Sequence, residues 1–164
     1  MRILSIIFKL KRSRLKKEFN RVLPLNEILS DRWEKAKFLR FGENTSVYDS
    51  SYVFGDVIVG KNTWIGPNTI LDGSGGLTIG DYCSISAGVQ IYTHDSVKWA
   101  LSGGVEKYEY APVNIGNNVY IGPNTIISKG ISIGDRSLIG ANSFVNRSFP
   151  ADSKIAGNPA KPIS

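Results

Sequence analysis

The sequence has very little of the two side chains that most often carry metal or covalent chemistry. Its 164 residues include one cysteine and one histidine. A single cysteine excludes an intramolecular disulfide and is typical of a reducing compartment such as the cytosol. A single histidine excludes a zinc site built on three histidines, and we expect no bound metal. A serine or cysteine nucleophile would compete for that one histidine, which leaves general-base catalysis as its chemical role.

Long apolar runs are also missing. The apolar stretch at residues 3–10 is too short to span a bilayer and lacks the order of a signal peptide. The net charge of +6 is concentrated at the N-terminus, because residues 1–21 contain eight basic side chains and one acidic one. Residues 22–164 are therefore nearly neutral, and we expect no nucleic-acid partner. We expect a cytoplasmic location, because a single cysteine fits a reducing compartment.

What the sequence does contain is a six-residue apolar repeat. It slips by two residues after Leu71 and is interrupted once, after Ile91. The period fits neither an α-helix nor an isolated strand, so it predicts a stacked architecture. Glycine often follows the apolar residue, and the fifth position of each repeat is usually small. The apolar positions are Phe41, Val47, Val53, Val59, Ile65, Leu71, Ile79, Ile85, Ile91, Ile115, Ile121, Ile127, Ile133, Ile139 and Val145.

The repeat predicts an all-β fold, a parallel β-helix with the cross-section of a triangular prism. Six residues form one short strand and a corner, where glycine, asparagine or aspartate tolerates a positive φ. Three sides close a coil of about eighteen residues, and successive coils stack about 4.8 Å apart. The register groups residues 41–155 into about five coils, with a tail at 156–164. The small positions should face inward, which makes Cys83 a core side chain and not a nucleophile.

Residues 1–40 predict a basic helical extension, with a second helix expected at 25–39. Two roles remain open for residues 1–21. Their helix packs across the end of the prism as the cap that a repeat protein needs, or it lies on an anionic membrane surface. The second role would hold the protein at the inner face of the cytoplasmic membrane. The apolar side chains expected near one face are Ile3, Ile7, Leu10, Leu15, Phe19 and Val22.

The interruption of the repeat is the candidate site of chemistry. Residues 93–112 carry no repeat pattern and predict a protruding loop, and long loops in an otherwise regular fold are usually functional. The loop begins with His94, the single histidine, which is therefore the candidate general base. An acidic neighbour could fix its tautomer, and the sequence does not choose among the candidates. These are Asp95, Glu106 and Glu109.

Three stretches resemble one enzyme family. They are IYTHD at 91–95, APVNIGNNVYIGPN at 111–124, and IGDRSLIGANSFV at 133–145 followed by GNPAK at 157–161. The chain resembles the acetyl-CoA-dependent O-acetyltransferases of the hexapeptide-repeat family over roughly residues 41–163. That family includes galactoside and maltose acetyltransferases and enzymes that acetylate bacterial polysaccharide sugars. The resemblance implies a left-handed β-helix, a homotrimer, and acetyl-CoA held in a groove between two prisms.

The resemblance also implies roles for individual residues. His94 would deprotonate a sugar hydroxyl, which then attacks the thioester carbonyl of acetyl-CoA, with Tyr92 and Asp95 beside the acceptor. The expected acceptor is a sugar of a surface polysaccharide (lipopolysaccharide, capsule or exopolysaccharide), free, lipid-linked or nucleotide-linked. The residues expected to contact the coenzyme are Tyr120, Ala141, Asn146, Arg147 and Lys161.

Two alternative functions remain, and they belong to different classes of protein. The first is an N-acetyltransferase that acts on a nucleotide-linked amino sugar. Many such enzymes carry an N-terminal βαβ nucleotide domain, which residues 1–40 are too short to form. The second is a non-catalytic β-helix that serves as a scaffold, which would need neither His94 nor the GNPAK stretch. Xenobiotic and serine acetyltransferases fit less well.

Overall fold

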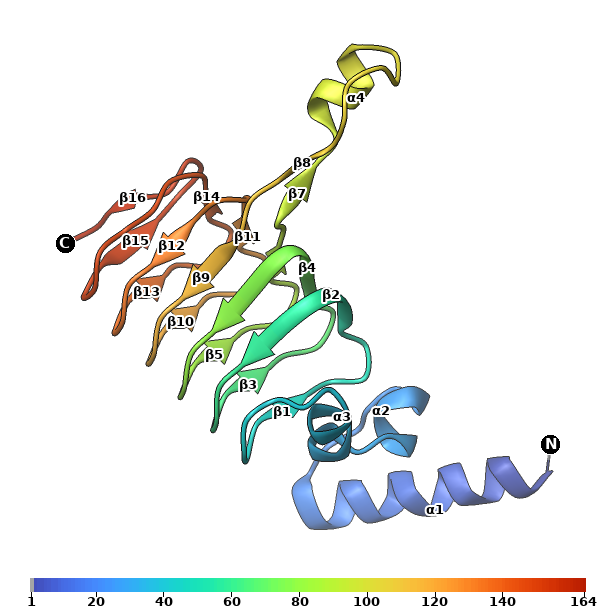
Figure 1. Ribbon diagram of the computed structural model, residues 1–164. Helices are drawn as coiled ribbons and strands as arrows, with labels where there is room; N and C mark the ends of the chain where they lie inside the picture. The colour runs from blue at the N-terminus through green and yellow to red at the C-terminus, as the bar shows by residue number, and fades with distance from the viewer. Residues whose placement is uncertain (1) are drawn as a thin grey trace.

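The computed structural model describes residues 2–164, and Met1, the first residue of the expected extension, lies outside the described residues. Figure 1 shows a stack of short strands, preceded by helices and interrupted by one long projection. The helices are α1 (Arg2–Phe19), α2 (Leu25–Leu29), α3 (Arg32–Phe38) and α4 (Val97–Leu101). The strands are β1 (Ser46–Val47), β2 (Tyr52–Val59), β3 (Trp64–Ile65), β4 (Ile70–Ile79), β5 (Ser84–Ile85), β6 (Gln90–Ile91), β7 (His94–Asp95), β8 (Glu109–Tyr110), β9 (Val113–Ile115), β10 (Tyr120–Ile121), β11 (Ile126–Ile127), β12 (Ser132–Ile133), β13 (Leu138–Ile139), β14 (Phe144–Val145), β15 (Lys154–Ala156) and β16 (Lys161–Pro162).

The strands form the faces of a parallel solenoid. One sheet has the order β1-β3-β5-β10-β13-β15-β16, and the other runs β12-β9-β4-β6-β11-β14 with β2 beside β4. The second sheet covers two sides of the prism, because β2 and β4 are long enough to continue around a corner. Val47 pairs with Ile65, eighteen residues later. The predicted coil length is therefore confirmed where the repeat is regular.

The solenoid has about six turns, where the repeat predicted about five. The sixth begins after Phe149, which bridges Ile133, and continues through Ile155, which pairs with Ile139. Both pairs are sixteen residues apart, so this turn is two residues shorter than the regular eighteen-residue turn. A search for a strict six-residue period therefore ends at Val145. Strand β16 then pairs antiparallel with β15 and covers its free edge.

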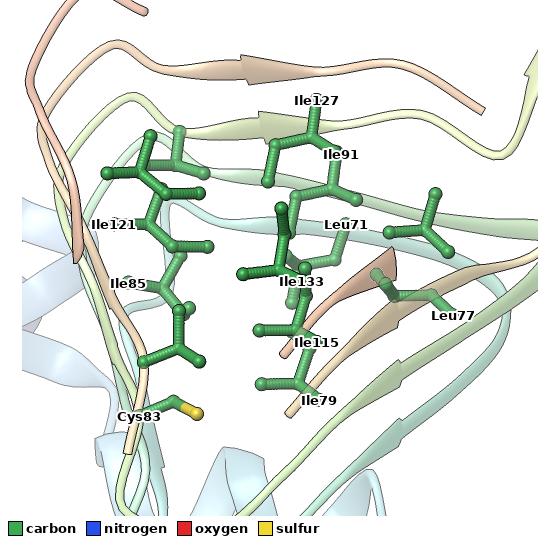
Figure 2. Close-up of a cluster of buried hydrophobic side chains, with 14 of the residues drawn as sticks. Leu71, Leu77, Ile79, Cys83, Ile85, Ile91, Ile115, Ile121, Ile127 and Ile133 are labelled. Atoms are coloured by element: carbon green, nitrogen blue, oxygen red, sulfur yellow. The ribbon is translucent and has the colours of Figure 1, made fainter. Parts of the chain in front are cut away.

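The apolar residues of the repeat stack inside the prism (Figure 2). Ile85 and Ile121, in neighbouring coils, have no exposed surface. The same holds for Ile139 in the next coil. Each buried isoleucine stabilises the fold by about 1.5–3 kcal/mol relative to an exposed one. Cys83 is 2% exposed, and burial raises the pKa of its thiol. The prediction of a core cysteine is confirmed.

The corners use glycine for a reason that the repeat pattern did not predict. A Cβ on Gly60 would lie 2.7 Å from the backbone carbon of Gly80, and one on Gly122 would lie 2.5 Å from the backbone nitrogen of Ala141. Stacked coils approach too closely for a side chain at this position. The positive φ at several corners belongs instead to asparagine, as at Asn62 (55°).

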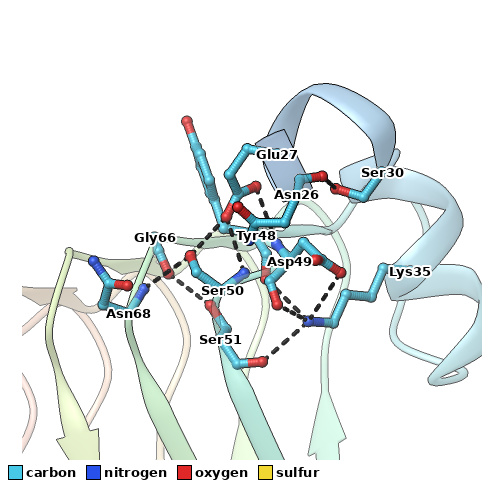
Figure 3. Close-up of polar contacts among 10 residues, drawn as sticks. All are labelled: Asn26, Glu27, Ser30, Lys35, Tyr48, Asp49, Ser50, Ser51, Gly66 and Asn68. Atoms are coloured by element: carbon cyan, nitrogen blue, oxygen red, sulfur yellow. Dashed lines mark hydrogen bonds and ion pairs between the residues drawn. The ribbon is translucent and has the colours of Figure 1, made fainter. Parts of the chain in front are cut away.

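The first coil is capped by α2 and α3. Buried Glu27 accepts hydrogen bonds from the backbone nitrogens of Asp49 (3.1 Å) and Ser50 (2.9 Å), and Figure 3 shows this contact. The ammonium group of Lys35 donates to three carbonyl oxygens of the same corner, those of Tyr48, Asp49 and Ser51. Helix α3 packs against β1, whereas α1 contacts α2. The cap expected of residues 1–21 is therefore supplied by the two shorter helices.

Candidate active site

The projecting loop leaves the prism as a pair of short strands. Strand β7 pairs antiparallel with β8, so that His94 faces Tyr110 and Asp95 faces Glu109. Helix α4 forms the far end of the loop (Figure 1). The pairing places the single histidine at the point where the loop joins the solenoid.

The imidazole of His94 contacts a buried carboxylate. Its Nδ1 lies 2.7 Å from Oδ2 of Asp72. The Asp72 side chain is 3% exposed and that of His94 is 33% exposed, so one group is enclosed while the other reaches solvent. Asp72 belongs to β4, where the repeat slips by two residues. That slip is a local insertion in the corner that faces the loop.

Asp72 is held in place by further hydrogen bonds. Its Oδ1 accepts from the backbone nitrogen (3.0 Å) and the hydroxyl (2.6 Å) of Ser74. Its Oδ2 accepts from the backbone nitrogen of Thr93 at 2.9 Å. Burial raises the pKa of the Asp72 carboxyl, but hydrogen bonds from Ser74, Thr93 and His94 outweigh it and hold that pKa below its ordinary value. Asp72 is therefore ionised at neutral pH.

The ionised carboxylate determines which nitrogen of His94 carries the proton. A carboxylate can only accept hydrogen bonds, so Nδ1 must be the donor in this contact. In the neutral imidazole, Nε2 is then an unprotonated acceptor. The pair thus presents a base on the exposed side of the ring.

Aromatic rings surround the exposed side of His94. The ring of Tyr110 lies 5.6 Å from the imidazole, centroid to centroid, and that of Tyr108 lies 6.2 Å away, both nearly parallel to it. Trp99 of α4 meets Tyr108 edge to face at 5.6 Å. Because all three rings are more than a third exposed, they form an open aromatic surface next to the base.

Two of the three acidic residues considered for orienting His94, Asp95 and Glu109, have other partners. Lys129 donates to Oδ2 of Asp95 at 2.6 Å and to Oε2 of Glu109 at 3.2 Å. Lys98 approaches Glu109 at 2.6 Å. These ion pairs fasten the base of the loop to the solenoid. The group that orients His94 is Asp72, which the sequence analysis did not consider.

The other predicted site residues are distributed over several strands and corners. Tyr92 is half-buried, and its hydroxyl donates to Oε1 of Gln90 at 2.8 Å. Tyr120 and Lys161 are exposed on β10 and β16 of one sheet. Exposed Ala141 follows β13 of that sheet, while exposed Asn146 and Arg147 follow β14 of the other, with the Arg147 guanidinium 4.9 Å from the Phe149 ring. The five residues expected to contact the coenzyme thus lie on two faces of the prism.

Two family models match the chain. Residues 112–147 match the bacterial transferase hexapeptide (six repeats), and residues 56–93 match the hexapeptide repeat of succinyl-transferase. The galactoside O-acetyltransferase of Escherichia coli K12 is 34% identical over 158 residues, which cover 94% of this chain and 77% of that protein. A putative colanic acid biosynthesis acetyltransferase, WcaF of E. coli K12, is 27% identical over 62% of this chain and 65% of its own length.

Solved structures resemble most or nearly all of the chain. A galactoside acetyltransferase in complex with coenzyme A superposes with a TM-score of 0.72 at 30% identity, over 98% of this chain and 81% of that one. An N-acyltransferase from Bacillus cereus, AntD, has a TM-score of 0.67 at 20% identity over 80% of this chain and 87% of its own, and shares the fold. The solenoid is therefore a left-handed β-helix. The protein belongs to the hexapeptide-repeat acyltransferases of the sugar O-acetyltransferase type.

Proposed function

We propose that the protein transfers an acetyl group from acetyl-CoA to a hydroxyl group of a sugar, with His94 as the general base. The observation that carries this proposal is the contact of 2.7 Å between His94 and buried Asp72, which leaves Nε2 free to accept a proton. The family supplies the donor, since a relative that covers nearly the whole chain holds coenzyme A.

The proposed reaction runs in one step of addition and one of elimination. Nε2 of His94 takes the proton of the acceptor hydroxyl as its oxygen attacks the thioester carbon. The imidazolium that forms is stabilised by the Asp72 carboxylate, which needs no proton of its own. The tetrahedral intermediate then collapses, the C–S bond breaks, and the CoA sulfur takes the proton from Nε2. The base is regenerated in its original tautomer.

The acceptor is proposed to lie on the aromatic surface of the loop. A sugar ring has apolar C–H faces and polar edges, so it can pack on Tyr108 and Tyr110 while one hydroxyl reaches His94. Tyr92 and Asp95 stand at the same junction, and Lys129 holds the Asp95 carboxylate in position. These groups form the acceptor side of the site.

The coenzyme is proposed to lie between two copies of the chain in a homotrimer. One flat prism face makes a poor pocket, whereas two packed faces make a groove. The division of the predicted contacts between two faces supports this arrangement, because each copy could offer one face to each neighbour. Lys161 would meet a phosphate of the coenzyme as a point charge.

We further propose that the acceptor sugar belongs to surface-polysaccharide assembly on the cytoplasmic side of the membrane. The similarity to a putative colanic acid biosynthesis acetyltransferase supports this role. Acetylation of a nucleotide-linked amino sugar is the competing role, and it would use the same base on an amine.

A screen of acceptors with acetyl-CoA tests the proposed function. We expect release of the free CoA thiol to rise at least about tenfold above the rate without acceptor for one or more sugars that offer only hydroxyls. The screen includes simple glycosides, lipid-linked sugars and nucleotide-linked sugars with and without an amine. An ester product loses its acetyl group in mild base, whereas an amide keeps it. Stimulation by amino sugars alone, with a base-stable product, would contradict O-acetylation, and stimulation by no acceptor would favour a scaffold.

A further inference from the structure

Helix α1 exposes a band of apolar side chains in its first ten residues. Ile3 is 75% exposed, Leu4 54%, Ile6 56%, Ile7 41% and Leu10 66%. A single exposed leucine is ordinary on a protein surface, whereas a contiguous apolar patch marks an interaction site. At 3.6 residues per turn, Ile3, Ile6, Ile7 and Leu10 share one side of the helix.

Apart from Arg2, the basic residues of this segment begin where the patch ends. From Lys9 to Arg21 the chain carries seven basic side chains and one acid, Glu18, which pairs with Arg14 at 2.9 Å. On the helical wheel Lys9 lies beside the apolar side, and Lys17 lies in line with it, two turns beyond Leu10. The basic side chains are Lys9, Lys11, Arg12, Arg14, Lys16, Lys17 and Arg21.

The rest of the fold uses only the second half of α1. Leu15 and Phe19 line a groove together with Ile28 and Trp33, which joins α1 to the two capping helices. The first half extends past them, away from the prism (Figure 1). The end of the prism is already closed by α2 and α3, so the band from Ile3 to Leu10 has no capping role.

We propose that α1 binds the surface of anionic phospholipid bilayers. The apolar band would enter the boundary between headgroups and acyl chains, and the lysines and arginines would contact lipid phosphates. Among residues 2–164, no helix has the length and apolar character needed to cross a bilayer, so the interaction lies in the plane of the surface. Pairing of α1 with the α1 of a second copy would place two sets of cations side by side, and this repulsion favours the lipid surface.

Co-sedimentation of the full-length protein with vesicles tests the proposal. At low salt we expect binding to vesicles of phosphatidylcholine mixed with phosphatidylglycerol and none to phosphatidylcholine alone. The double substitution Lys9→Gln with Lys17→Gln should weaken binding on the order of tenfold, and Leu10→Gln should weaken it roughly fivefold. Because the attraction is partly between exposed charges, added salt should weaken wild-type binding.

Matched controls distinguish binding through α1 from nonspecific effects of net charge and of exposed apolar surface. Lys37→Gln with Lys154→Gln removes the same charge from other exposed positions, and Phe38→Gln removes an aromatic ring that is 80% exposed on α3. Both controls should bind vesicles as the wild type does. The proposal is overturned if wild-type protein ignores the anionic vesicles, if the controls weaken binding as much as the α1 variants, or if Leu10→Gln changes the oligomeric mass and leaves vesicle binding intact.

Discussion

Replacing His94 with alanine is expected to lower kcat for acetyl transfer by about 10²–10⁴-fold, the range that general-base catalysis supplies. The chain has no second histidine to take over the proton. The imidazole is one-third exposed and packs beside aromatic rings of the loop, so its removal should leave the solenoid folded. The measurement is release of the CoA thiol in the presence of an accepted sugar.

Val105→Ala provides the matched control for His94→Ala. Val105 belongs to the same loop and is 84% exposed, so this variant tests for disturbance of the loop alone. Circular dichroism and the oligomeric mass should match the wild type for both variants. Turnover by His94→Ala equal to that of Val105→Ala would remove His94 from the mechanism.

Replacing Asp72 with asparagine is expected to lower kcat by on the order of 10²–10⁴-fold while the KM for acetyl-CoA changes little. The amide can donate a hydrogen bond to Nδ1 of His94, which then becomes the acceptor. The proton would move to Nε2, and the exposed side of the ring would present an acid where the reaction needs a base. Steady-state kinetics with accepted sugar and varied acetyl-CoA separates the two parameters.

The Asp72 variant also has a structural effect, and the two effects can be told apart. The pKa of the Asp72 carboxyl is lower in the folded state than in the unfolded chain. The carboxylate therefore stabilises the fold at pH values above the pKa that Asp72 has in the unfolded chain. This contribution is lost as the pH falls, so wild type and variant should differ in stability at neutral pH and converge in acid. Asp56→Asn, an exposed position on the neighbouring coil, serves as the control. A fall in kcat that merely follows the folded fraction would reduce Asp72 to a structural role.

The fold could be predicted from the sequence because one period governs most of the chain. Ile85 and Ile121 mark neighbouring coils, and the inward position of each is dictated by the same six-residue register. The final turn was missed because it is two residues shorter, which moves Ile155 out of register. The sequence left two roles open for residues 1–21, a cap or a membrane-surface helix, because amphipathicity does not show what a helix packs against. The buried contact of Glu27 with the first corner could not be read from spacing alone.

The position of His94 at the loop junction was predictable and its contact with Asp72 was not. His94 stands where the period stops, and the period makes that position conspicuous. Asp72 is 22 residues away from His94 in sequence. The two-residue slip of the repeat beside Asp72 was nevertheless visible in the sequence. A polar insertion of this kind, next to a loop, is a usable signal for a site residue. Asp95 was considered because it is adjacent to His94. Consecutive residues of a strand point to opposite sides, so a strand at 94–95 turns the Asp95 side chain away from the imidazole.

The most direct test of this account is the tautomer of the neutral His94 ring in the full-length protein, measured by ¹⁵N NMR of the imidazole. Because the chain has a single histidine, the ring signals need no assignment. The contact with Asp72 predicts a proton on Nδ1 and a free Nε2. The Asp72→Asn variant should show the opposite tautomer. A wild-type ring that carries its proton on Nε2 would contradict the proposal that Asp72 prepares His94 to act as a base.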